Sequence, residues 1–87
     1  MNELMTAKTK YEELIARMEA DIATAEKFKK DLEDRYKEGL PLEALVTIQS
    51  QILRIQDYIT QKFNNLVEIQ RGLGEIEKAI KEAEATA

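Results

Sequence analysis

The sequence contains neither cysteine nor histidine, and these two absences exclude a large share of protein chemistry. Without cysteine the chain has no disulfide, no thiolate nucleophile and no thiolate metal ligand. Without histidine it lacks the commonest proton shuttle and metal ligand. We therefore expect a protein that is not an enzyme, with no catalytic residue, no metal site, no cofactor and no small-molecule substrate.

Glycine, proline and long apolar runs are also scarce. Three glycines and one proline leave few places where the chain can turn. No run approaches the ~18–20 apolar residues that a membrane-spanning helix needs. Glu3 stands where a secretion signal carries basic residues, and no apolar stretch follows it. The sequence therefore predicts a single domain, residues 1–87, with a cytoplasmic location and no membrane insertion.

Positive charge is in deficit and is not concentrated anywhere. The net charge of −4 opposes binding to a phosphate backbone, which requires clustered lysine and arginine. The one short basic cluster, residues 27–30, is followed at once by Asp31, Glu33 and Asp34, which cancel its field. We expect no nucleic-acid partner.

The second half of the chain contains a regular apolar seam. Apolar residues recur every seven positions, and a second set follows three residues after the first, with Lys62 as the only interruption. The two sets are Leu45, Ile52, Ile59, Leu66, Leu73 and Ile80, and Ile48, Ile55, Ile69, Ile76 and Ala83. This is the a/d pattern of a helix that packs along another helix. It predicts a helix over about residues 42–71.

The first half has a similar but more charged pattern. Its inward residues are also spaced by seven: Leu4, Tyr11, Met18, Ala25 and Leu32. Asn2 is a suitable N-cap, and Glu3 suits the positive end of a helix. The remaining positions carry opposite charges four residues apart, each pair worth only about 0.2–0.5 kcal/mol. The spacing, more than these pairs, predicts a helix over about residues 3–38.

Gly39, Leu40 and Pro41 form the one clear break between these patterns. Glycine suits the left-handed residue after a helix, and proline suits the first turn of a new one. A turn of residues 39–41 is short enough to make the two helices antiparallel neighbours. The predicted fold is all-α, a coiled-coil-like antiparallel α-helical hairpin. Because two helices alone enclose no interior, we expect oligomerisation or a partner helix to complete it.

Gly72 and Gly74 leave the end of the second helix open, because each costs roughly 1 kcal/mol relative to alanine inside a helix. They are compatible with a helix end, with a kink, or with the close approach of another backbone. Residues 75–84 return to good helix formers and predict a short helical segment. That segment either extends the second helix, folds back as a third helix or stays loose.

Several acidic and seam-position polar residues are candidates for chemistry. The acids are Glu12, Glu13, Glu19 and Asp21. A di-metal bundle needs a Glu-x-x-His partner, and paired catalytic carboxyls need opposite sides of a cleft, so we interpret these acids as a solvated face. Asp21 and Lys62 fall on seam positions, where they either form a register-setting polar layer or extend to solvent.

The second helix carries more apolar surface than one partner helix can cover. Val46, Leu53 and Val67 form a second apolar row, and Tyr58 and Phe63 add aromatic surface beside the seam. An exposed row of this kind marks an interaction surface. We predict that these five residues bind a protein partner or a second copy of the chain. The alternative is that the row packs against residues 75–83.

These motifs carry a resemblance to a known family. They are Lys29-Lys30-Asp31, Gly39, Pro41 and the run IQSQILRIQDY at residues 48–58. The stretch of roughly residues 25–70 resembles the small helical-hairpin needle chaperones of bacterial type III secretion systems, in which a charged first helix meets a Gln-rich apolar second helix. The resemblance implies one member of a chaperone pair that keeps a needle subunit monomeric in the cytoplasm. It also implies a contact surface on the second helix, at positions such as Leu53 and Tyr58.

The needle subunits themselves are the second resemblance. Pro41, Gln49, Ser50, Tyr58 and Asn64 occur in an order similar to theirs, although the chain lacks their paired-proline turn and runs past their usual C-terminus. Three functions therefore stay open: a chaperone or adaptor that binds an amphipathic helix, a self-assembling needle, filament or coiled-coil subunit, and a small acidic inhibitor of phage type.

Overall fold

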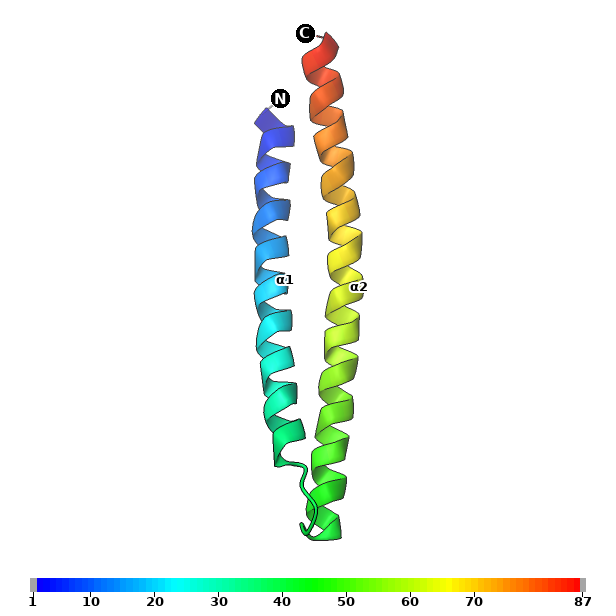
Figure 1. Ribbon diagram of the computed structural model, residues 1–87. Coiled ribbons are helices and arrows are strands. Elements are labelled where there is room, and N and C mark those ends of the chain that lie inside the picture. Colours follow the sequence, from blue (N-terminus) through cyan, green and yellow to red (C-terminus); the bar gives the residue numbers. More distant parts are fainter. Residues whose placement is uncertain (1, 87) are drawn as a thin grey trace.

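The computed structural model describes residues 2–86, which form two long helices joined by one loop. Helix α1 spans Asn2–Arg35 and helix α2 spans Leu42–Thr86. The helices run antiparallel and side by side, so the N- and C-termini lie at the same end of the hairpin (Figure 1). The prediction of an all-α antiparallel helical hairpin is confirmed, and residues 2–86 contain no strand.

Helix α1 ends three residues earlier than the sequence pattern predicts. Its last turn tightens, because the Tyr36 amide donates to the Glu33 carbonyl at 3.2 Å, a bond that spans three residues instead of four. Beyond Leu32, the last of the sevenfold-spaced residues, the sequence supports the final turn only with the pairing of Glu33 with Lys37. A pair of this kind is worth only about 0.2–0.5 kcal/mol, too little to hold a last turn when the chain has to cross to the second helix.

The connection between the helices occupies residues 36–41, longer than the predicted turn of 39–41. Gly39 has a φ of 90°, which places it in the left-handed region that glycine enters without strain. It bends the loop rather than capping α1 directly, because α1 already ends at Arg35. The Pro41 carbonyl accepts a hydrogen bond from the Leu45 amide at 3.1 Å and so begins α2.

Helix α2 continues through Gly72 and Gly74 without interruption. Of the alternatives open for residues 75–84, the structure therefore shows extension of the second helix, which reaches Thr86. The reason lies partly across the seam, because a Cβ atom at Gly72 would stand 2.7 Å from Cε2 of Tyr11. Gly72 makes room for an aromatic side chain of α1, whereas Gly74 faces open space.

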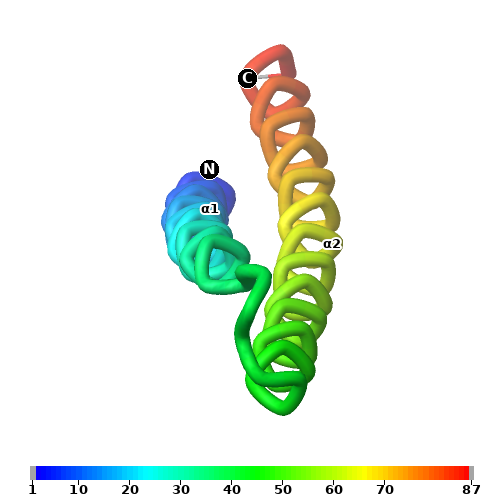
Figure 2. Tube along the Cα trace, turned by 60° about the horizontal axis from the view of Figure 1, so that its bottom comes forward, coloured from blue at the N-terminus to red at the C-terminus, as the bar shows by residue number. Residues whose placement is uncertain are grey.

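The core lies along the seam between the helices and is thin. Its most buried side chains come from both helices: Met18, Ile22, Leu32, Ile59, Leu66 and Ile80. No side chain among residues 2–86 is less than 2% exposed. The hairpin measures 69 × 14 × 14 Å, and its radius of gyration of 19.8 Å far exceeds the ~12 Å of a compact domain of this length. The turned view in Figure 2 shows this single pair of helices joined by the loop.

Candidate protein-binding surface

The hairpin has two flanks, one on each side of the seam. The flank that a side chain faces depends on whether its residue precedes or follows the neighbouring seam residue. Consecutive residues of an α-helix are rotated by roughly 100° about its axis. A residue that directly follows a seam residue therefore faces one flank, and a residue that directly precedes one faces the other. Because the helices are antiparallel, this rule gives the same flank for both. We call the flank faced by residues that directly follow seam residues the groove flank.

Apolar side chains of α2 line the groove flank. Val46, Leu53 and Val67 directly follow the seam residues Leu45, Ile52 and Leu66. Leu42 and Phe63 each lie four residues before a member of this set and share its face. We call Leu42, Val46, Leu53, Phe63 and Val67 the α2 outer row. Their side chains are 39–75% exposed, so the row is left uncovered by α1 and by residues 75–86.

Tyr58 lies apart from the other four predicted binding residues. It precedes the seam residue Ile59 and therefore faces the flank opposite the groove flank. There it lines a shallow depression together with Phe28 of α1 and the edge of Ile55. Phe28 and Tyr58 are 58% and 43% exposed, so this flank also carries apolar surface, but only as a small patch.

A row of glutamates on α1 borders the α2 outer row. Glu12, Glu19, Glu26 and Glu33 directly follow the seam residues Tyr11, Met18, Ala25 and Leu32, so they face the groove flank and are exposed. We call these four residues the glutamate row. Near the loop, Glu33 lines the same depression as Leu53 and Gln49. The groove flank thus combines an apolar helix face with an acidic border.

Two polar contacts join the helices, one between Lys29 and Gln56 and one between Asp21 and Lys62. The Lys29 ammonium donates to Oε1 of Gln56 at 2.6 Å, and the Gln56 amide donates in turn to Oγ1 of Thr60 at 3.3 Å.

The Asp21 carboxylate and the Lys62 ammonium approach to 3.9 Å, with the Lys62 ammonium 5.5 Å from the centre of the Tyr58 ring. The expectation that Asp21 occupies a seam position is wrong, because Ile22 is the buried residue there and Asp21 lies beside it on the flank of Phe28 and Tyr58. Both side chains keep solvent contact, at 53% for Asp21 and 32% for Lys62. Of the two interpretations open from the sequence, the structure shows extension to solvent, with a long ion pair beside the seam and not a polar layer within it.

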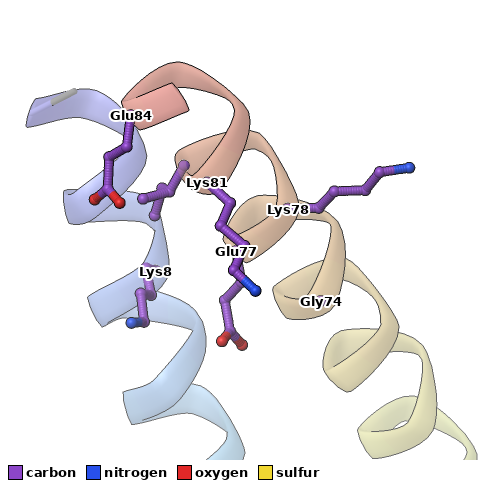
Figure 3. Close-up of a pocket in the computed structure, with 7 residues that line it drawn as sticks. Lys8, Gly74, Glu77, Lys78, Lys81 and Glu84 are labelled. Atoms are coloured by element: carbon purple, nitrogen blue, oxygen red, sulfur yellow. The ribbon is translucent and has the colours of Figure 1, made fainter. Parts of the chain in front are cut away.

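The open end of the groove flank has mixed charge. Lys8 of α1 faces a depression that α2 lines with Gly74, Glu77, Ile80, Lys81 and Glu84. Figure 3 shows the charged side chains of both signs interleaved there, with Lys78 directed away from α1. The acidic character of the groove flank is therefore confined to the stretch between Glu12 and Glu33.

Two further kinds of site were sought among residues 2–86, a metal site and a membrane-spanning helix. No group of three or more histidine, cysteine, aspartate or glutamate residues within 2–86 is placed to hold a metal ion. Neither α1 nor α2 has a stretch apolar and long enough to cross a membrane. Of the ten large apolar residues that are exposed within this range, five belong to the α2 outer row.

Sequence reasoning missed two parts of this surface. Leu42, at 75% exposure the most exposed large apolar residue, lies before the first seam residue and was not assigned to any row. The glutamates were treated as an undivided solvated face. Their sevenfold spacing, each one residue after a seam position, is the pattern from which the row can be found.

Comparison of the chain with protein-family models, curated proteins and solved structures finds no match, so its function has to be inferred from its own surface.

Proposed function

We propose that this chain is a non-catalytic protein-binding module, a small chaperone or adaptor that covers the amphipathic helix of a partner. The partner helix lies along the groove flank, with its apolar stripe on the α2 outer row. This is helix-in-groove recognition, in which anchors at i, i+3 or i+4 and i+7 supply the affinity. The α2 outer row has this spacing.

The observation that carries the proposal is the amount of apolar surface that the hairpin leaves uncovered. A folded monomer of 10.0 kDa is expected to expose roughly 5,200 Å². This chain exposes 6869 Å². Part of the excess comes from the elongated shape, and part is the α2 outer row. The apolar part is shown by the row itself, whose five large side chains are 39–75% exposed along one face and are available for a partner helix to cover.

The test is a pair of charge insertions in the α2 outer row. Leu53→Asp and Val67→Asp place a carboxylate on the proposed contact surface, where binding would bury it unpaired. We expect both variants to lose binding of an amphipathic helical peptide while circular dichroism shows an unchanged helical content. Asn65→Asp, which alters an exposed residue that directly precedes Leu66 and therefore faces the opposite flank, is the matched control and should bind normally. Unchanged affinity of the Leu53 and Val67 variants would contradict the proposal.

The resemblance to type III secretion needle chaperones makes the proposal more specific. In that case the partner is a needle subunit, and the chain acts in the cytoplasm as one member of a chaperone pair. Co-expression with a needle subunit would test this: the proposal requires a soluble complex of defined stoichiometry. A needle subunit that still polymerises in the presence of the chain would contradict it.

Self-assembly is the second candidate function, and the patch formed by Phe28 and Tyr58 favours it. Two apolar surfaces on opposite flanks allow head-to-tail association, which forms open filaments when the rotation between copies does not close. Sedimentation at increasing concentration separates the two functions. A chaperone stops at a dimer or a heterocomplex, whereas a filament subunit continues to grow.

A further inference from the structure

We infer that the helix bound on the groove flank has a basic edge: beside its apolar stripe, lysine or arginine recurs about every seven residues and faces the glutamate row of α1. This inference rests on the proposed function and adds the chemistry of the partner. It follows from the position of the glutamate row, which any helix seated on the α2 outer row has to pass.

The register of the hairpin brings the two rows to the same level. Asp21 contacts Lys62, and the antiparallel arrangement means that a step back along α1 matches a step forward along α2. Glu19, two residues before Asp21, is therefore level with Asn64, two residues after Lys62, and so lies one residue's rise from Phe63. A helix resting on Phe63 has Glu19 along its edge.

The acidic border is least compensated around Glu12 and Glu19. The exposed residues between and after them on the same side of α1 are Ala16 and Ala23, which are uncharged and short. Nearer the loop, Lys29 and Lys30 lie among the glutamates, and Lys29 already donates to Gln56. A third helix can thus approach α1 closely at the alanines, with its edge meeting the carboxylates of Glu12 and Glu19.

Two copies of this chain fit poorly when they meet groove flank to groove flank. If two hairpins stack face to face with α2 on α2, their glutamate rows also meet, and like charges at close range repel. If they stack with α2 on α1, each apolar row rests on the other copy's glutamates, which would lose their hydration unpaired. A helix of opposite edge charge avoids both costs. The complementary occupant is therefore a different, basic-edged chain.

The length of the acidic stretch sets the length of the matching helix. From Glu12 to Glu33 the rise along α1 is about 30 Å, or three heptads. The probes for the test are therefore three synthetic amphipathic peptides, each about four heptads long, with the same leucine stripe. One has lysine along one edge, one has glutamate there and one has glutamine.

Binding of the three peptides to the full chain is measured by titration at low and at high salt. We expect the lysine-edged peptide to bind about tenfold more tightly than the glutamate-edged one at low salt, with the difference shrinking at high salt. The double variant Glu12→Lys/Glu19→Lys should reverse this order. The control Glu13→Lys/Asp34→Lys makes the same change in net charge on the outer face of α1 and should preserve it.

Each outcome decides a separate question. If the three peptides bind the unaltered chain equally and all three are lost with Leu53→Asp, the basic-edge inference is overturned while the proposed function stands. If the control variant reverses the preference as strongly as Glu12→Lys/Glu19→Lys, the preference reflects net charge and the inference also fails. If no peptide binds, both the inference and the proposed function are overturned.

Discussion

Helices α1 and α2 bury similar seams but present different outer surfaces. Away from the seam, α1 is charged, and its larger exposed apolar residues are scattered. In contrast, α2 carries an uncharged strip of five large apolar side chains along one face. The comparison shows that α1 is satisfied by one neighbour and water, whereas α2 has apolar surface for a second neighbour.

The difference also separates two roles that an apolar residue has in this chain. Seam residues such as Leu66 hold the hairpin together, whereas residues such as Leu53 contribute little to the isolated chain. Four experiments test this separation, or the contacts on which the pairing of the two helices depends.

The largest effect is expected from shortening a seam residue. Leu66 is 7% exposed and packs with Met18, Ile22 and Ile59. Leu66→Ala removes buried methyl groups and should lower the free energy of unfolding by about 2–3 kcal/mol in chemical denaturation. The control Leu53→Ala removes the same atoms from an exposed position and should stay within about 0.5 kcal/mol. If both variants lost the same free energy of unfolding at low protein concentration, the distinction between seam and outer row would be wrong.

The next largest effect concerns the loop that pairs the two helices. Gly39→Ala places a Cβ atom on a residue with a φ of 90°, although there is free space around it. The cost is backbone strain, which should lower the stability of the hairpin by about 1–2 kcal/mol, seen as a shifted denaturation midpoint. A variant as stable as the unaltered chain would mean that the loop adopts another conformation.

Two glycines on α2 allow a matched comparison of its inner and outer sides. Gly74→Ala meets no neighbouring atom and should raise the free energy of unfolding by up to about 1 kcal/mol, through helix propensity alone. Gly72→Ala gains the same propensity but drives a methyl group against the Tyr11 ring, so its net effect should be smaller or negative. Replacing Tyr11 by alanine as well should restore the gain at residue 72. Equal effects at the two glycines would show that the Tyr11 contact is not formed in solution.

The smallest effect is expected from the ion pair across the seam. Asp21 and Lys62 stand 3.9 Å apart and remain partly in water, so their coupling should be about 0.2–1 kcal/mol. A double-mutant cycle with Asp21→Ala and Lys62→Ala measures it, and the coupling should fall as salt increases. A coupling well above this range would mean that the pair is buried, as it would be if the flank carrying Phe28 and Tyr58 were covered by another chain.

Much of the fold follows from residue spacing. The sevenfold recurrence predicts the seam that buries Ile59, Leu66 and Ile80, and the break at residues 39–41 predicts the antiparallel pairing. The continuity of α2 was beyond the sequence, because two glycines argue locally for a helix end. What overrides them is a contact from distant sequence, the Tyr11 ring over Gly72, together with the seam that resumes at Leu73 and Ile76.

The candidate surface could be predicted only in part. Composition and spacing pick out Val46, Leu53 and Val67, and the position of an aromatic residue before or after a seam residue also gives the flank that it faces. Tyr58 and Phe63 lie on opposite flanks, because Tyr58 directly precedes the seam residue Ile59 and Phe63 directly follows the seam position Lys62. The neighbouring glutamates become part of the surface only when the antiparallel register places α1 beside α2.

The hairpin is only two helices thick, and this governs how it opens. Each helical turn is stabilised by its own helix and by the facing turn of the other helix. Separation of α1 from α2 can therefore begin at the paired termini while the helices stay in contact near the loop. Sequence separation across the seam grows from the loop toward the termini, although the closure entropy rises only slowly with it. We therefore expect the two helices to separate first at the termini, with residues 36–41 as the hinge. Amide hydrogen exchange should be fastest at the termini and slowest beside Ile59.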